Sequence, residues 1–533
     1  MKKIVLLLIG SAFFASTVFV SAQETENLAG SEVIADSSAE ESAGESAGEN
    51  KEPVETAETS ETDNTASDDI AFDTSSLSGE SSGFLHENDG KKHWFSAISF
   101  VAFFNVGLCT WNRYMIGSSW AKVGWDEWDH FWERKLSWDD DWYWTNFVLH
   151  PYQGSLYYMA SRGSNLNMLE SFAITVVGSA AWEYLCETNA PSKNDMTYTT
   201  IGAVAVGEML YRLSLNADEV SSLLGFAINP TRLWTQGWTR QKPRGTTHNI
   251  HELYTKVGIG STQTHTNLIH YNGDYKQNEL YPVFVSPEIY VAYNDPYGHD
   301  SNDPFGEFEL KGSFAVGAGS GYGADCAYKK IDKKMMYDIR IESNSMLWAR
   351  APKLSESTDT TVGLSFIYDF DWHSFYQLCC LTPALAIKQR VNGESSRFEW
   401  QAHLGWDLLG TTDFYYFHRD LIKSDSSTNR TYSYTMGPQA LLRARWISDS
   451  GFALNFGVRG YAMYDFYNQL KDHASTGYEY IGIANASVEV PVSKKLRLGI
   501  GDEIYLKRAY YKDLPDVFQA VNTGSLFAKW QLR

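Results

Sequence analysis

The residues best suited to chemistry lie between positions 150 and 195. His150 comes first, and the carboxylates Glu183, Glu187 and Asp195 follow it, with Ser155 or Ser161 available as a hydroxyl group. A histidine that is oriented by a carboxylate can activate a hydroxyl group or a water molecule, which is the chemistry of a hydrolase. His150, Glu183 and Asp195 are therefore candidate catalytic residues of an enzyme that acts on lipid or glycan.

The same residues also fit a structural role. Glu183 and Glu187 are one helical turn apart and share a face, as are Glu208 and Arg212. Carboxylates placed in this way lie on one side of any substrate, whereas a glycosidase holds them on both sides of the bond it cleaves. Polar groups among apolar neighbours need partners, so we expect a structural or binding network and keep catalysis as the alternative. The expected members are His150, Tyr152, Arg162, Glu183, Glu187, Asn194, Asp195, Glu208 and Arg212.

Motifs for metals and cofactors do not occur in a usable context. The acidic triplet 139–141 lacks the spaced ligands and the glycine of a calcium loop. The Gly-x-Ser-x-Gly at 44–48 lies in an acidic repeat, where a strand-to-helix elbow cannot form. The sequence has no Cys-x-x-Cys, no His-Glu-x-x-His and no phosphate-binding loop. We expect no metal and no cofactor.

Several stretches upstream of residue 249 have the composition of helices. The run 94–111 is almost continuously apolar, interrupted by Asn105, and predicts a buried or interfacial helix. The stretch 120–142 is dense in Trp and Asp, which favours a helix at the level of lipid headgroups over a surface that stacks on a sugar. Gly and Ala in 178–184 and 202–214 allow helices to approach closely.

Five motifs in this region follow one another in the order of a known family. They are His-Pro-Tyr-x-Gly at 150–154, Gly-Ser-x-x-Trp-Glu-Tyr at 178–184, Pro-Ser-x-Asn-Asp at 191–195, Gly-Glu-x-x-Tyr-Arg at 207–212 and Asn-Pro-x-Arg at 229–232. Through them, residues 140–240 resemble the uncharacterised bacterial domain-of-unknown-function family numbered 3943. The resemblance implies an exported protein of a double-membrane bacterium, often with a strand-rich C-terminal part. It implies no catalytic role for any residue.

From residue 249 onward, apolar and polar residues alternate in roughly twelve segments. Between Phe398 and Leu408 the apolar side chains occupy the even positions and the polar ones the odd positions. A period of two is the pattern of a β-strand, and Asn392-Gly393 favours a two-residue hairpin turn before this one. Each segment can supply the strand of about 9 to 11 residues that crosses a bilayer. Polar residues expected to line a barrel lumen are Glu399, His403, Arg443, Arg445 and Arg459.

A soluble sandwich also has alternating strands, but two features favour a barrel. Short turns alternate with longer polar loops, such as 294–304, 409–431 and 468–477, and aromatic residues gather near strand ends, at 413–417 and 461–467. Aromatic girdles of this kind mark a membrane interface. The expected fold class is therefore α+β, with a small helical domain followed by an antiparallel transmembrane β-barrel of roughly 12 strands. The last strand ends in Arg533 instead of the terminal aromatic residue common in outer-membrane barrels.

Composition divides the chain into four parts. Residues 1–22 form a secretory signal peptide with a small-x-small cleavage site. Residues 24–90 carry 19 acidic side chains and one lysine, so we expect a disordered acidic linker over 23–90. Residues 91–248 form the helical domain and residues 249–533 the barrel. These last two parts hold 46 acids and 41 bases, a balance that implies no nucleic-acid partner.

These observations predict a protein of the cell outer membrane. The helical domain would plug the lumen or cap the periplasmic mouth, and the barrel would serve as a conduit, a transporter or an envelope scaffold. Outer-membrane lipid and the barrel assembly machinery are the expected partners, and the substrate, a small molecule or a lipid, is unknown. The alternative is the outer-membrane enzyme at His150, Glu183 and Asp195.

Overall fold

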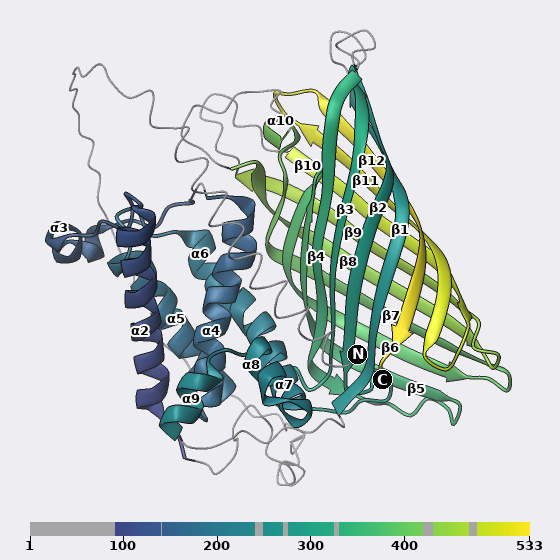
Figure 1. Ribbon diagram of the computed structural model, residues 1–533, viewed down its shortest axis with the longest axis horizontal. Coiled ribbons are helices and arrows are strands. Elements are labelled where there is room, and N and C mark those ends of the chain that lie inside the picture. Colours follow the sequence, from purple (N-terminus) through teal and green to yellow (C-terminus); the bar gives the residue numbers. More distant parts are fainter. Residues whose placement is uncertain are drawn as a thin grey trace, which may run out of the picture. The chain divides into compact units, whose positions relative to one another are not determined.

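The computed structural model describes residues 91–139, 141–239, 249–269, 275–323, 330–418, 430–467 and 477–533. The predicted signal peptide and acidic linker lie outside the described residues. Helices occupy the described chain before residue 240, and strands follow from residue 250 (Figure 1). The predicted order of a helical part and a strand-rich part is therefore confirmed.

The helical region contains eight α-helices in its described residues. They are α2 (Trp94–Trp111), α3 (Trp125–Asp129), α4 (His150–Gly163), α5 (Met168–Leu185), α6 (Lys193–Thr197), α7 (Ala203–Val220), α8 (Ser222–Ile228) and α9 (Arg232–Thr239). The Trp-dense stretch 120–142 is helical only over α3 and one 3-10 turn, Phe131–Glu133. Its rings pack against α5 instead: the Trp120 ring lies 6.2 Å from Trp182, and Trp128 donates to the Leu185 carbonyl. Tertiary contacts override the expected helix here.

Local sequence signals fix where these helices begin and how closely they pack. Asn167 caps α5 by accepting a hydrogen bond from the Glu170 amide, and the Glu170 side chain completes a capping box. Gly154 of α4 faces α7, and a Cβ at this position would lie 2.7 Å from Ala203 Cβ. Gly178 of α5 meets Val101 of α2 in the same way. Small residues therefore set the helix spacing, as the sequence predicts.

Twelve antiparallel strands form a closed barrel in the order β1-β12-β11-β10-β9-β8-β7-β6-β5-β4-β3-β2 (Figure 1). The strands are β1 (Ile250–Ile269), β2 (Tyr275–Tyr293), β3 (Phe308–Gly323), β4 (Lys330–Arg350), β5 (Thr358–His373), β6 (Gln377–Asn392), β7 (Ser396–Asp413), β8 (Tyr432–Ser448), β9 (Ala453–Tyr467), β10 (Gly477–Pro491), β11 (Leu496–Tyr511) and β12 (Asp516–Gln531). The predicted strand number is confirmed. The strands are longer than expected, because the shortest has 15 residues and the longest 21.

The two faces of the wall have the predicted polarity. On β7, Leu404 is 63% exposed on the outside, whereas its neighbour His403 is 2% exposed on the inside. Outward apolar residues with similar exposure occur on the other strands, among them Leu385, Ile500 and Leu526. Because successive residues of a strand point to opposite faces, the alternation turns apolar groups outward and charges inward.

Two local predictions fail at the strand ends. The turn before β7 has three residues, 393–395, and the Gly393 amide bonds to the Ser396 carbonyl at 2.9 Å. Phe414, Tyr415 and Tyr461 are at most 4% exposed, so they do not belong to an outward aromatic girdle. Phe414 and Tyr415 join a buried cluster with β1, β11 and β12 instead, because the connection after β7 packs against these strands.

The barrel has two distinguishable ends. β1 begins and β12 ends at the same end, which we call the terminal end, together with the connections 294–307, 351–357, 393–395, 449–452 and 492–495. The opposite end, which we call the far end, carries the turn 374–376 between β5 and β6.

The helical region contacts the outside of the wall. On β5, the outward row that includes the exposed Leu364 continues to Tyr368 and Phe370, which are 1% and 0% exposed. Tyr368 donates to the Phe147 carbonyl at 2.6 Å, and the Phe370 ring stacks 5.3 Å from Tyr143. Residues from the helical region thus cover outward-facing side chains that would otherwise be exposed.

Candidate functional site

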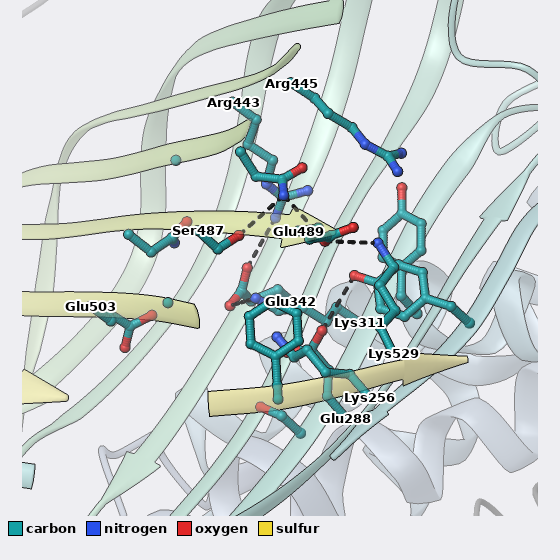
Figure 2. A pocket seen from close by; sticks show the side chains of 18 of the residues that line it. Lys256, Glu288, Lys311, Glu342, Arg443, Arg445, Ser487, Glu489, Glu503 and Lys529 are labelled. Atoms are coloured by element: carbon teal, nitrogen blue, oxygen red, sulfur yellow. Dashed lines mark hydrogen bonds and ion pairs between the residues drawn. The ribbon is translucent and has the colours of Figure 1, made fainter. Parts of the chain in front are cut away.

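The lumen holds a cavity of about 680 Å³. Charged side chains of both signs point into it, and Figure 2 shows several of them gathered from different strands. Adjacent opposite charges form ion pairs, such as Lys256 with Glu288 at 2.7 Å and Lys529 with Glu489 at 3.2 Å. The charged residues labelled in Figure 2 are Lys256, Glu288, Lys311, Glu342, Arg443, Arg445, Glu489, Glu503 and Lys529.

Some ion pairs join strands that are far apart around the ring. Arg443 of β8 binds Glu309 of β3 at 3.1 Å and Glu342 of β4 at 2.9 Å. Arg340 of β4 binds Glu503 of β11. In the closed ring of twelve strands, β8 lies five strands from β3, and β4 lies five strands from β11. The members of these pairs are thus nearly opposite each other, and the contacts cross the lumen. The cavity is therefore divided by charged bridges.

The structure places four of the five predicted lumen residues on the cavity wall. Glu399, Arg443, Arg445 and Arg459 all line it. His403 also points inward, but it lies beyond the cavity lining, and its ring nitrogens meet Ser365 Oγ at 2.9 Å and Gln401 Oε1 at 3.1 Å. This histidine is held in a hydrogen-bonded site between strands.

An aromatic layer, absent from the sequence-based predictions, fills the lumen on the far-end side. The turn between β5 and β6 brings Phe375 and Tyr376 inward. The Tyr376 ring stacks 3.8 Å from Tyr505 of β11, and the Phe375 ring lies 5.4 Å from Tyr281 of β2. Gln519 of β12 donates to the Phe375 carbonyl at 3.2 Å. The buried cluster around them comprises Tyr281, Phe284, Ala315, Met336, Phe375, Tyr376, Leu378, Cys380, Tyr461, Met463, Ile481, Ile483, Tyr505 and Val521.

The cavity reaches the terminal end and stops at the aromatic layer. Its lining includes Ser493 and Lys494 of a terminal-end turn and the C-terminal Arg533. Toward the far end the lining includes Phe284 and Met336, which belong to the aromatic layer. The lumen is thus a charged vestibule with an apolar floor.

The connection 294–307 carries charges that bind the wall at the terminal end. Asp295 accepts two hydrogen bonds from Arg390, at 2.8 and 2.9 Å. Glu307 pairs with Lys388 at 2.7 Å, and neither side chain is exposed. Burial raises the pKa of Glu307 to about 7, although the positive charge of Lys388 acts in the opposite direction. These contacts hold the connection against the barrel.

The predicted catalytic residues converge on each other. His150 Nε2 lies 3.7 Å from Asp195 Oδ1, and the Glu183 carboxylate accepts the Ser192 amide at 2.7 Å. Asn194 bridges the group, donating to Asp195 at 2.7 Å. His150, Glu183 and Asp195 are 6%, 1% and 3% exposed. None of the three lines the lumen cavity or the shallow groove on the outer wall near Ile259.

The two candidate serine hydroxyls, Ser155 and Ser161 of α4, are already used within that helix. Ser155 Oγ donates to the Pro151 carbonyl at 2.6 Å, and Ser161 Oγ donates to the Tyr157 carbonyl at 2.9 Å. A hydroxyl nucleophile needs its base within hydrogen-bond reach. The arrangement therefore resembles a structural network more than a nucleophile with its base.

The remaining predicted residues form separate contacts. Arg162 and Arg212 both bind Glu208, each at 2.8 Å, and Arg212 also binds Asp303 of the connection 294–307 at 2.8 Å. Glu187 accepts from Trp182 Nε1 at 2.7 Å, and Tyr152 packs against the core of the helical region. In the described parts of the chain, no three His, Cys, Asp or Glu side chains group as a metal site.

The helices do not fill the lumen in the described structure. All residues that line the lumen cavity come from strands and their connections. The helical region was expected to plug the lumen or cap one mouth. It contacts the terminal end of the barrel where Arg212 of α7 binds Asp303 of the connection 294–307. The larger contact lies on the outside of the wall.

The sequence resemblance is confirmed over part of the helical region. Residues 135–230 match the family described as "Domain of unknown function (DUF3943)". No curated protein matches the chain. The match identifies the domain but adds no activity.

Solved structures similar to this chain match about half of it. The transport unit of the Escherichia coli autotransporter AIDA-I shares 11% identity at a TM-score of 0.27, over 52% of this chain and 90% of its own. The COG4313 outer membrane channel from Pseudomonas putida F1 shares 12% identity at 0.27, over 53% and 96%. The Escherichia coli outer membrane protease OmpT shares 8% identity at 0.23, over 53% and 97%. Because these TM-scores and identities are low, the assignment of a barrel depends on the strand pairing of this chain itself.

Proposed function

We propose that this protein is an outer-membrane barrel that conducts or transports a small polar solute through a lumen that is closed in this conformation. The observation that carries the proposal is the polarity of the closed wall, whose apolar side chains face outward around a charged cavity. A barrel in water would expose this apolar surface, whereas lipid covers it. Bacterial outer membranes are the usual location of such single-chain barrels.

The solute would enter the vestibule from the terminal end. Lys256, Glu288 and other paired charges suit a polar or zwitterionic molecule, which can exchange ion pairs with the wall. Passage requires the aromatic layer at Phe375 and Tyr376 to move aside, because it lies across the lumen. The turn 374–376 that carries both rings would therefore act as the gate.

Outer-membrane lipid and the barrel assembly machinery are the partners of this proposal. The enzyme alternative at His150, Glu183 and Asp195 receives less support, because these side chains are buried and bonded to one another. Neither the lumen cavity nor the groove near Ile259 is lined by any of the three.

The test is the conductance of single proteins in planar bilayers. The double variant Phe375→Ala, Tyr376→Ala removes both rings from the lumen, and we expect its conductance to rise at least several-fold above that of the unmodified protein. The matched control is Tyr480→Ala, which removes an outward ring that is 54% exposed. Heat-dependent gel mobility shows that each variant is a folded barrel. A folded double variant that conducts no better than the control would overturn the proposal.

A further inference from the structure

The contact between the helical region and the barrel lies at the depth of the apolar wall. On β7, the outward residues Leu404, Trp406 and Leu408 are 63%, 54% and 55% exposed. The next residue, Leu409, accepts a hydrogen bond from Tyr198 of the helical region at 2.7 Å. A segment that packs beside this apolar row replaces lipid there, provided that the barrel is in a membrane.

The contacts of the helical region with the barrel extend from the far-end half of β5 to the terminal-end connection 294–307. Just before α4, Phe147 meets Tyr368 near the far end of β5. At the other end of α4, Arg162 binds Glu208, which binds Arg212 and through it Asp303 at the terminal end. The 14 residues of α4 span about 21 Å at 1.5 Å per residue, which is close to the thickness of the apolar band of a barrel.

α2 has the length and composition of a membrane-crossing helix. Together with the π-helical turn Asn112–Ile116 that follows it, α2 contains an apolar stretch in which only 28% of the residues are buried. Phe95, Ile98, Phe103 and Val106 follow helical spacing and are between 53% and 67% exposed. The face that they share is apolar and exposed, like the outward face of the barrel wall.

The amide side chain of Asn105 in α2 points the other way, into the helical region. Asn105 is 5% exposed, donates to the Gly178 carbonyl at 3.0 Å and accepts from Tyr157. The charges of α4 and α7 are likewise paired inside, as in the fully buried Arg162 and Glu208. Charges and amides directed inward and paired are characteristic of helices in lipid.

We infer that the helical region crosses the bilayer beside the barrel, with lipid acyl chains covering the exposed face of α2. This inference rests on the proposed outer-membrane location and extends it to the helices. The helices would then be a lateral part of the membrane domain and not a cap in the periplasm. The Trp-rich segment between α2 and α4 would lie at one membrane interface, where exposed rings such as Trp125 and Trp132 are favourable.

Site-directed spin labelling of the full chain in lipid nanodiscs tests the inference. In a chain whose five cysteines are replaced by alanine, single labels are placed by Val106→Cys on α2, by Leu404→Cys on the barrel wall and by Lys494→Cys in a terminal-end turn. Collisions with oxygen report lipid, and collisions with a water-soluble nickel chelate report water. We expect the label at 106 to match the label at 404, with an oxygen-to-nickel accessibility ratio at least tenfold above that at 494.

The two lipid-facing positions make the failures distinguishable. If the label at 404 is in lipid and the label at 106 is in water, the barrel location stands and this inference is overturned. If the label at 106 is shielded from both reagents, a second copy or a partner covers α2, and the inference is also overturned. If the label at 404 is in water, the outer-membrane proposal itself fails. Should the cysteine-free chain not fold, a benzoylphenylalanine at Phe103 in the native chain replaces the label, with crosslinking to lipid expected and its absence contradicting the inference.

Discussion

The helical region and the barrel both place charges inside, but they surround those charges differently. Arg162 and Glu208 in the helical region are fully buried and bind each other. Their further polar partners include Arg212 and Tyr158 for Glu208 and the Leu166 carbonyl for Arg162. In the barrel, the side chain of Arg443 is 27% exposed to the lumen cavity while it binds Glu309 and Glu342. One network is dry and the other borders a space large enough for water.

This difference decides how much each charge depends on its partner. A buried ion that loses its partner keeps the full cost of desolvation, which makes removal of one member strongly destabilising. An ion beside a hydrated cavity can replace a lost partner with water at little cost. The helical network should therefore be sensitive to single substitutions, and the lumen network should tolerate them.

The largest expected effect is that of Glu208→Ala. The substitution leaves Arg162 and Arg212 without their shared carboxylate, and breaking a buried pair in this way costs about 3–5 kcal/mol. Denaturant titration followed by tryptophan fluorescence measures the loss in the helical region. The control is Glu170→Gln, whose partner Lys92 is 35% exposed and whose expected loss is below about 1 kcal/mol. Equal losses of unfolding free energy in Glu208→Ala and Glu170→Gln would contradict the expected difference between a buried and an exposed ion pair.

A smaller effect is expected for Gly154→Ala. The new Cβ would press on Ala203 of α7 and on Thr199 in the π-helical turn Tyr198–Gly202 before it, so the helices must separate at a cost of roughly 1–3 kcal/mol. Gly107→Ala on α2 is the matched control, because nothing lies within 4 Å of its added Cβ. There the higher helix propensity of alanine should stabilise the region by up to about 1 kcal/mol. The same titration compares the two variants, and a shift of the same sign in both would contradict the close approach of α4 and α7.

The smallest effect is expected for Arg443→Gln in the lumen. Water in the cavity can solvate Glu309 and Glu342 after the guanidinium is lost, so the barrel should lose less than about 1 kcal/mol. The urea concentration at which the heat-resistant folded band disappears on gels provides the measurement. A loss as large as that of Glu208→Ala would mean that the lumen network is as dry as the helical one.

The sequence was informative about the barrel because its pattern is local. Alternation of apolar and polar residues within one strand, as between Phe398 and Leu408, reports the two faces without reference to any other strand. The strand number and the inward direction of Arg443 follow from this pattern. The length of the strands does not follow from the pattern, because the alternation weakens where the outward side chains are no longer apolar.

The position of the helices and the closure of the lumen could not be read from the sequence. Tyr368 and Phe370 have the outward position of lipid-facing residues, and nothing local shows that helices cover them. Tyr461 resembles an interfacial aromatic residue, but it is buried in the lumen layer with Tyr376. An aromatic turn at 374–376 without glycine or proline is a signal that could have suggested an inward fold.

The sequence predicts which polar residues of the helical region form a network, but it does not predict most of the contacts between them. Pairing of Glu208 with Arg212 follows from helical spacing. The contact of Arg212 with Asp303 joins residues 91 positions apart, and that of Glu183 with the Ser192 amide depends on how the chain turns after α5, so only the folded chain reveals them. Burial of His150 is likewise a tertiary property.

The length of the strands means that the wall outreaches the hydrocarbon. β4 has 21 residues, and at about 3.3 Å per residue and a tilt of about 45° it rises roughly 50 Å, about twice the height of the apolar band. On β1 the outward side chains change from Val257 and Ile259 to Gln263 and His265 toward the far end. In the proposed membrane, the far-end part of this sheet would therefore stand in the aqueous phase as an ordered collar of strands, which large molecules could contact in addition to the loops.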